Sequence, residues 1–495
     1  MANEIGLSLK QKMERVRFAP SPTGPLHIGG VRTALFNYLY AKKEQGVFVV
    51  RIEDTDRARY VKGAEEYIFD ALKWLSIPVD ESPVHGGMFG PYRQSERKEI
   101  YKKYIQILLN KGYAYYAFDT TETLQKMRDE AEAKGETFKY GKHNRDNLDN
   151  SLSLDEEEII KKVLRESYVV RLKNVESEYI VARDLLRGKV SVKADEIDDK
   201  IIMKADGMPT YHFANVVDDH LMKITTVIRG EEWLPSLALH TLIYKYFDWE
   251  KPNFIHLPLI LKTQGKGKLS KRDGDKGGFP VFPLTWENSE GFKEKGYLSE
   301  GVVNYISLLG WNSGDEEEIF VLEELKNRFG IGGLQKGGAR FDIKKAEWIN
   351  SQHLQQLDAR EIIRRMGLET NENLELRVNL IRERANTMID IGKMLKWFDE
   401  TPATYDNKVI QKFDTLSCRN LLSRVREHYI KTSRLTKQDY VEILNELEIK
   451  IGEGMQCLRL CLFGELIGPD LFEFMVLLGK DVVLERINRL ENNLI

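Results

Sequence analysis

The sequence predicts an α/β protein in which a doubly wound parallel sheet is interrupted by an inserted domain and followed by an all-α part. Short apolar strand patterns alternate with amphipathic helix patterns from residue 14 to about 110, and strand patterns return after residue 211. Residues 111–210 lose this alternation. Residues 351–495 hold only seven of the 37 glycines and two of the 14 prolines, so helix-breaking residues are scarce where long helices are expected.

The first elements follow one another in a strand–helix–strand–helix order. Residues 14–19 form a strand pattern, and residues 31–40 are expected to be helical. A second buried strand is predicted over residues 47–52, and apolar residues at helical spacing predict helices over residues 64–75 and 100–108. Because successive strands are joined by helices, we expect the strands to be parallel.

The inserted segment has a different sequence pattern. It contains a polar stretch at residues 142–150, an acidic helix start at residues 155–158 and a short strand at residues 168–172. A strand at residues 224–229 then completes the first domain. We therefore expect a discontinuous domain of residues 1–110 and 211–256, an insertion of residues 111–210, a region of residues 257–335 and a helical domain of residues 336–495.

Composition limits the class of protein without naming it. The chain has 495 residues, of which 42% are hydrophobic and 31% charged, and its net charge of −3 requires any nucleic-acid contact to come from local patches. Three cysteines are too few for a disulfide framework, so Cys457 and Cys461 are expected to be buried thiols. We find no secretory signal and no apolar run of membrane-spanning length, which predicts a cytoplasmic protein.

A loop suited to phosphate follows the first strand. Residues 20–30 contain three prolines and lead into the predicted helix, whose N-terminus favours negative charge. Gly29 and Gly30 allow a ligand to approach the backbone, and His27 can donate to a phosphoryl oxygen. The loop therefore predicts an ATP site. A Walker-type ATPase is excluded, because the chain has no Gly-x-x-x-x-Gly-Lys-Ser/Thr run.

A basic segment at residues 266–274 is predicted to be a mobile loop. Together with residues 27–30 it resembles the two signatures of class I aminoacyl-tRNA synthetases. Residues 51–56, 211–215 and 227–233 resemble bacterial-type glutamyl-tRNA synthetases in order and approximate spacing. The resemblance is strong over residues 14–350 and rests on helical character and position beyond them.

The resemblance implies a reaction and a set of parts. It implies ATP-dependent activation of L-glutamate to glutamyl-adenylate, with Mg²⁺ accompanying ATP, and transfer of glutamate to the terminal adenosine of tRNA. No protein nucleophile is required, so the site must orient the reactants and stabilise charge. The parts would be a Rossmann-type catalytic domain, an acceptor-binding insertion, a stem-contact region and a helical anticodon-binding domain, in a monomer.

The resemblance also implies two sets of site residues. The catalytic and ATP-binding set is His27, Gly29, Gly30, Glu232, Lys268, Ser270, Lys271 and Arg272. The glutamate-binding set is Arg17, Ala19, Ser21, Glu53, Tyr211, Asn215, Arg229 and Trp233. Arg17 and Arg229 suit carboxylates, and Glu53 suits the substrate ammonium. Lys271, with Lys268 beside it, would face the charge that develops on pyrophosphate.

The chain departs from the wider family at two places. Gly30 stands where the first signature usually ends in histidine, a variant associated with the glutamate enzymes. The insertion lacks the cysteine cluster that binds zinc in many relatives, so neither a structural zinc nor any other metal site is predicted. In the tail, Arg360, Arg364 and Arg365 are candidate phosphate contacts.

Several alternatives stay open or are disfavoured. Glutaminyl-tRNA synthetases end in β-barrels, and Arg229 would face a neutral amide in them, so the helical tail and this arginine disfavour that assignment. A paralogue that glutamylates a modified base would lack the tail. A non-discriminating enzyme that also charges the glutamine tRNA, or a synthetase-like tRNA-binding protein without catalysis, remains an alternative.

Overall fold

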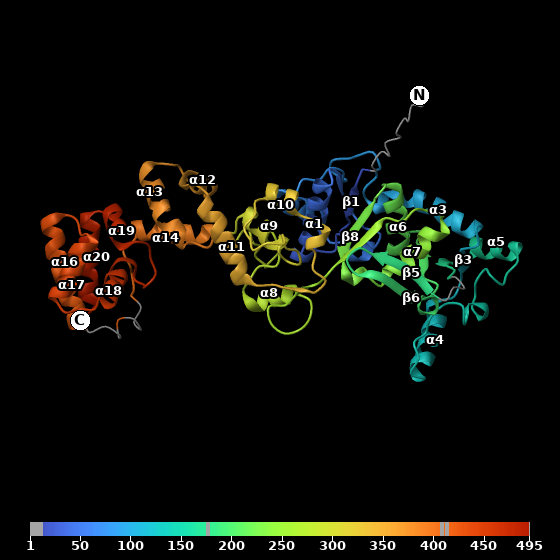
Figure 1. The fold of residues 1–495 in the computed structure, drawn as a ribbon. Helices are drawn as coiled ribbons and strands as arrows, with labels where there is room; N and C mark the ends of the chain where they lie inside the picture. The colour runs from blue at the N-terminus through green and yellow to red at the C-terminus, as the bar shows by residue number, and fades with distance from the viewer. Residues whose placement is uncertain (1–12, 175–178, 406–409, 411–414, 495) are drawn as a thin grey trace, which may run out of the picture. The chain divides into compact units, whose positions relative to one another are not determined.

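The computed structural model describes residues 13–174, 179–405, 410 and 415–494 (Figure 1). Two compact units make up the chain: residues 1–289 with 306–342, and residues 290–305 with 343–495. Residues 1–12, where the sequence shows no secretory pattern, lie outside the described residues. Within the described ranges, no helix combines the length and the apolar character needed to span a bilayer.

A four-stranded parallel sheet forms the centre of the first unit, in the order β2–β1–β8–β9. Its strands are β1 (Arg15–Phe18), β2 (Val47–Val50), β8 (Thr226–Gly230) and β9 (Asn253–Leu257). The helix α1 (Ile28–Lys43) connects β1 to β2. The predicted parallel sheet is thus confirmed. Its neighbours β1 and β8 lie about 200 residues apart in the sequence because the insertion separates them.

Helices pack on this sheet and enclose a core. α1 contacts β1, β2 and β8, and α3 (Lys98–Asn110), α6 (Tyr211–Leu221) and α7 (Ser236–Tyr246) share a buried cluster with residues of the strands. α2 (Ala64–Trp74) belongs to the same unit. Val49 and Val227 of the strands pack with Phe213 of α6 and Leu242 of α7 in one buried cluster. This packing fixes where α6 lies relative to the ends of the strands, and those ends border the site described below.

The insertion has its own small sheets. Its elements are β3 (Ala114–Ala117), α4 (Thr121–Ala133), α5 (Glu156–Arg165), β4 (Val169–Leu172), β5 (Tyr179–Asp184), β6 (Gly188–Lys193) and β7 (Ile201–Met203). β3, β4 and β7 form one antiparallel sheet, and β5 pairs with β6 in a hairpin that also contacts α7. The acidic helix start is confirmed, since the Asp155 carboxylate caps α5 by accepting from the Glu158 N–H at 2.8 Å.

The second signature differs from the prediction. The loop expected through residue 274 is wrong, because the helix α8 (Lys271–Gly277) already begins at Lys271. Asp273 explains the early start: its carboxylate accepts from the Ser270 backbone N–H at 2.9 Å and from the Ser270 hydroxyl at 2.5 Å. In the same unit, β10 (Ile260–Leu261) precedes α8 in the chain, and α10 (Leu322–Arg328) and β11 (Ala339–Arg340) follow it, whereas α9 (Ser299–Ser307) lies largely in the second unit. β10 pairs with β11 in parallel.

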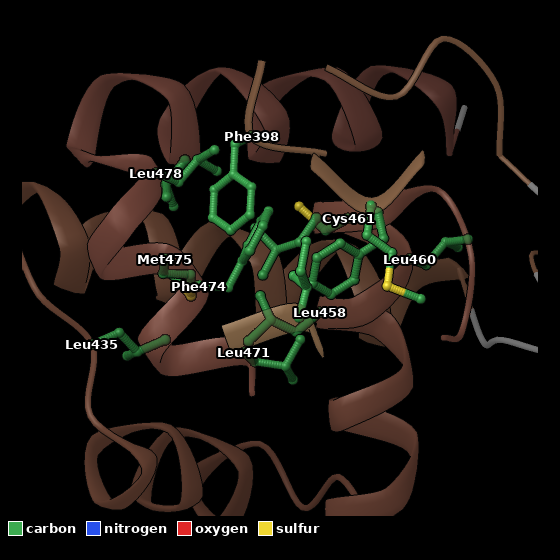
Figure 2. Close-up of a cluster of buried hydrophobic side chains, with 14 of the residues drawn as sticks. Phe398, Leu435, Leu458, Leu460, Cys461, Leu471, Phe474, Met475 and Leu478 are labelled. Atoms are coloured by element: carbon green, nitrogen blue, oxygen red, sulfur yellow. The ribbon is translucent and has the colours of Figure 1, made fainter. Parts of the chain in front are cut away.

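The second unit is helical, as the scarcity of glycine and proline predicts. Its helices are α11 (Ile343–Gln356), α12 (Ala359–Arg365), α13 (Glu372–Ile381), α14 (Met388–Asp399), α16 (Thr415–Thr432), α17 (Lys437–Glu446), α18 (Ile451–Phe463), α19 (Leu471–Leu478) and α20 (Lys480–Asn493). Figure 2 shows part of their shared core, in which Phe398 of α14, Leu458 of α18 and Phe474 of α19 meet.

The cysteines correct one expectation. Cys457 is not a thiol: it forms a disulfide with Cys418, and the two Cα atoms lie 6.4 Å apart. Cys461 is free and buried, as expected. The pairing escaped prediction because it depends on how α16 packs against α18, across 39 residues of sequence, and not on local spacing.

Candidate active site

A cavity of about 430 Å³ in the first unit is bordered by the carboxyl ends of β1 and β8. This edge of an open parallel sheet is where ligands bind. All eight residues of the predicted glutamate-binding set border the cavity, together with His27, Gly29, Gly30, Glu232 and Lys268. Ser270, Lys271 and Arg272 do not border it. Lys271 instead borders a second cavity of about 550 Å³, which His27 and Gly30 share.

His27 is held ready to donate one hydrogen bond. It is the N-cap of α1, and its Nδ1 accepts from the Gly29 N–H at 3.2 Å. Burial, with a further contribution from Lys268, lowers the pKa of His27 to about 4. The ring is therefore neutral near pH 7 and carries its proton on Nε2. Nε2 is buried and has no partner among the described residues, so an oxygen of a bound phosphate would satisfy it.

The glycines of this signature differ in what they tolerate. A Cβ at Gly30 would lie 2.6 Å from Cδ1 of Leu26, whereas a Cβ at Gly29 would meet only the His27 ring, at 3.7 Å. Leu26 is buried. The close approach of Leu26 gives a physical reason why glycine, and not histidine, stands at position 30.

The second signature presents a mixture of paired and exposed cations. Lys268 Nζ lies 2.9 Å from Oε1 of Glu232, and both side chains are partly exposed. Lys271 and Arg272 are exposed at the first turn of α8. The predicted hydroxyl of Ser270 is engaged with Asp273 inside this turn, so it serves the helix start.

Beneath the cavity lies a charge cluster that the sequence did not reveal. We define it as Arg17, Arg51, Arg97, Glu53, Asp218 and Asp219, all buried. Arg51 is central: its Nη1 lies 2.8 Å from Oδ1 of Asp219 and its Nη2 lies 3.0 Å from Oε1 of Glu53. Three arginines face three carboxylates, so the cluster balances its own charge, as buried ions require.

Two predicted ligand contacts belong to this charge cluster. Arg17 directs Nε and Nη2 at Asp219, at 3.0 and 3.1 Å, so one edge of its guanidinium is already occupied. Asn215 accepts from Arg17 at 3.4 Å and donates to Glu53 at 2.8 Å, so it orients both charged groups. Burial raises the pKa of Glu53, and the positive charge of Arg51 only partly opposes this effect. A ligand ammonium would favour its ionised form.

Arg229 stands apart from the charge cluster. It is 4% exposed, and all its hydrogen-bond acceptors are neutral. Nε donates to His256 at 3.0 Å, Nη1 to the Tyr211 hydroxyl at 3.3 Å and to His240 at 3.4 Å, and Nη2 to the Trp233 carbonyl at 3.3 Å. Among the described residues, no carboxylate forms an ion pair with it. A buried cation without a counterion makes this part of the cavity a site for an anion.

Sequence reasoning missed Asp219, His240 and His256. Asp219 had a local signal, because it follows Asn215 by four residues on α6 and therefore lies on the same helical face. The two histidines had none: His240 lies in α7 and His256 in β9, and only the fold brings them to Arg229.

The candidate phosphate contacts of the tail are ion-paired. Arg360 pairs with Glu375 at 3.0 Å. Arg364 pairs with Glu361 at 2.6 Å, and Arg365 with Glu300 at 2.8 Å. A phosphate would have to compete with these carboxylates. In the described ranges, no group of three or more His, Cys, Asp or Glu side chains is arranged to hold a metal ion.

The interrupted parallel sheet, the phosphate loop with its orphaned histidine and the basic helix start define the class I aminoacyl-tRNA synthetases. The family of class I tRNA synthetases (E and Q), catalytic domain, matches residues 13–348, and the anticodon binding domain matches residues 345–490. The chain therefore belongs to the class I synthetases of the glutamate and glutamine group, which confirms the resemblance noted in its sequence.

Full-length relatives narrow the group further. The glutamate–tRNA ligase of Flavobacterium johnsoniae is 49% identical over 494 residues, covering 97% of this chain and 99% of the relative. That of Bacteroides fragilis is 44% identical, covering 97% and 99%. The crystal structure of a glutamate tRNA ligase from Elizabethkingia meningosepticum, in complex with its amino acid, is 45% identical with a TM-score of 0.88 and covers 98% of this chain and 100% of that one.

Proposed function

We propose that this protein is a glutamate–tRNA ligase, which activates L-glutamate with ATP and transfers it to the 3′-terminal adenosine of the glutamate tRNA. The observation that supports this best is Arg229, a buried cation at the cavity wall whose partners are all neutral. A substrate with a negatively charged side chain supplies the missing counterion. The full-length relatives named glutamate–tRNA ligase support the same assignment.

Two charged groups of glutamate have candidate partners. The side-chain carboxylate binds Arg229, and the ammonium group binds Glu53, whose Oε1 is oriented by Arg51 and Asn215. The rings of Tyr211 and Trp233 pack at an angle of 31°, with their centroids 4.3 Å apart, and both border the cavity. Glutamine would leave Arg229 without an anion in a site built for one, and this unpaired charge is the source of discrimination.

The chemistry requires positioned charge and no protein nucleophile. An oxygen of the glutamate α-carboxylate attacks the α-phosphorus of ATP, the bond to the bridging oxygen breaks, and pyrophosphate leaves with the electron pair. His27 donates from Nε2 to a phosphate oxygen, and Lys268 and Lys271 add positive charge near the leaving group. Mg²⁺ enters with ATP as part of the substrate.

In the second step, the 2′-hydroxyl of the terminal adenosine attacks the activated carbonyl and AMP leaves. The tRNA is bound by three segments of the chain in this proposal. The insertion of residues 111–210 binds the acceptor end, with residues 257–335 along the stem, and the helical domain of residues 336–495 binds the anticodon.

Aminoacylation tests the proposal directly. The purified protein is incubated with ATP, Mg²⁺ and labelled glutamate, glutamine or aspartate, with either the glutamate or the glutamine tRNA. We expect glutamate on the glutamate tRNA. Glutamate on both tRNAs identifies the non-discriminating form, whereas tRNA binding with no charging by any amino acid refutes the proposal in favour of a non-catalytic binding protein.

A further inference from the structure

Two series of hydrogen-bonded side chains end at Arg229. On one side, Nε of Arg229 donates to Nε2 of His256 at 3.0 Å, and Nδ1 of His256 lies 2.7 Å from Oδ2 of Asp184. On the other side, Nη1 lies 3.4 Å from Nδ1 of His240, and Nε2 of His240 lies 3.2 Å from Nδ1 of His212. His256 lies in β9 and Asp184 in β5, whereas His240 lies in α7 and His212 in α6.

The hydrogen-bond chemistry assigns the protons on the His256 side. A guanidinium only donates, so Nε2 of His256 must accept and its proton must lie on Nδ1. That proton is donated to Asp184, which also accepts from the backbone N–H of His256 at 3.0 Å. His256 and Arg229 are directly opposed residues on the paired strands β9 and β8, and His256 is 0% exposed. The position and the tautomer of this ring are therefore both fixed.

The same reasoning applies to the His240 side. Nδ1 of His240 must accept from Arg229, so its proton lies on Nε2 and is donated to Nδ1 of His212. Burial, together with the positive charge of Arg229, lowers the pKa of His240 well below its usual value. Burial likewise lowers the pKa of His256. Both rings that contact the arginine are thus neutral near pH 7.

Neutral acceptors distinguish Arg229 from the arginines beside it. Arg17 and Arg51 are oriented by carboxylates, which also cancel their charge. A carboxylate at the position of His256 would orient Arg229 equally well but would compete with the substrate for it. An imidazole supplies the acceptor without the negative charge. The nearest carboxylate on this side, that of Asp184, is separated from Arg229 by the width of the His256 ring.

We propose that His256, held by Asp184, and His240, held by His212, are positioning residues that orient Arg229 while leaving its positive charge for the side-chain carboxylate of the substrate. This inference rests on the proposed function. Neither histidine touches the substrate in this scheme. They act through Arg229, and their effect falls on the recognition of the amino-acid side chain and not on ATP.

Two substitutions at one position test the proposal. His256→Leu removes the acceptor, whereas His256→Gln keeps a neutral oxygen that can accept from Arg229. We expect His256→Leu to raise KM for glutamate about 10- to 100-fold, the usual effect of losing a hydrogen bond to a charged group. We expect KM for ATP to stay within about threefold of the wild-type value. The preference for glutamate over glutamine should fall by the same factor as the affinity for glutamate. The Gln variant should recover most of the loss.

The control is His85→Leu, because His85 is exposed, borders neither cavity and lies outside the segments proposed to bind tRNA. It should leave every constant unchanged. The proposal is overturned if His256→Leu keeps its KM for glutamate, if it loses glutamate and ATP affinity together, or if the Leu and Gln variants are equally impaired. A wild-type protein that never activates glutamate would refute the proposed function instead, so the two failures are distinguishable.

A measurement on the unmodified protein covers the case in which the Leu variant does not fold. Nitrogen-15 NMR of histidine-labelled protein distinguishes the two neutral tautomers, and the His256→Gln spectrum identifies the signal by its loss. We expect His256 to be protonated at Nδ1 and His240 at Nε2. A proton on Nε2 of His256 overturns the proposal, because Arg229 could not then donate to it.

Discussion

Replacing Arg229 by alanine should abolish most of the affinity for glutamate without affecting ATP. In the free protein the arginine forms no ion pair with the described residues, so its removal there costs only hydrogen bonds to neutral groups. In the complex, the substrate carboxylate would lie against the cavity wall without a cation, which costs about 2–5 kcal/mol. Because water can enter a cavity of about 430 Å³, we expect the lower half of this range.

At about 1.4 kcal/mol for each factor of ten, a loss of about 2–3.5 kcal/mol lowers kcat/KM for glutamate roughly 30- to 300-fold. Pyrophosphate exchange with the glutamate tRNA present measures this constant, and ATP is varied in the same assay. Arg229→Lys is the matched control: it keeps the charge but loses the planar fork, so its loss should be smaller. A kcat/KM for glutamate within threefold of wild type in Arg229→Ala would refute the assigned role.

Three further predictions concern other parts of the molecule. His27 should stay neutral in the free protein down to about pH 5 and become protonated as the pH falls through about 4, the value to which burial lowers its pKa. An NMR titration of the ring measures this midpoint, and a midpoint near 6.5 would contradict the assignment of a buried neutral donor. Lys271→Ala should lower kcat about 10²- to 10³-fold, because the lost charge acts in the transition state, whereas Lys276→Ala on the same helix should leave kcat unchanged. Single-turnover kinetics would measure this difference, and a change in KM for ATP alone would argue against it. Denatured, non-reduced protein should show one titratable thiol, that of Cys461, and three thiols would disprove the disulfide. Cys418→Ser should lower the free energy of unfolding by about 4 kcal/mol, the loop-closure value for 39 residues.

Local patterns were enough to predict the strands and helices around the first signature, and the segment of residues 211–215 placed Tyr211 and Asn215 at the site. The reason is that strand alternation, helix spacing and capping are encoded within a few neighbouring residues. The start of α8 was missed although Ser270 and Asp273 stand at capping-box spacing.

The rest of the site depends on contacts that no local pattern encodes. Asp184 and His256 are separated by 72 residues, and Arg17 and Asp219 by 202. The first pair meets only when β5 of the insertion lies beside β9, and the second only when α6 packs against β1. Cys418 and Cys457, 39 residues apart, likewise meet only when α16 packs against α18. Sequence reasoning could therefore name the residues at the cavity wall but not the partners that set their charge.

In the part of the chain that the structure describes, Arg229 shares no hydrogen bond or ion pair with the charge cluster, so the cavity has two walls whose charged groups have different partners. In the proposed complex, Glu53 of the cluster binds the ammonium group that every amino acid has, and the ion pairs of the cluster also link β1, the segment that follows β2, and α6. Arg229 binds only the group that makes glutamate acidic in this proposal, and the two histidines act through Arg229. A change of amino-acid preference could therefore arise at one wall of the cavity, by a few substitutions in β8, β9 and α7, while the residues that maintain the fold stay as they are.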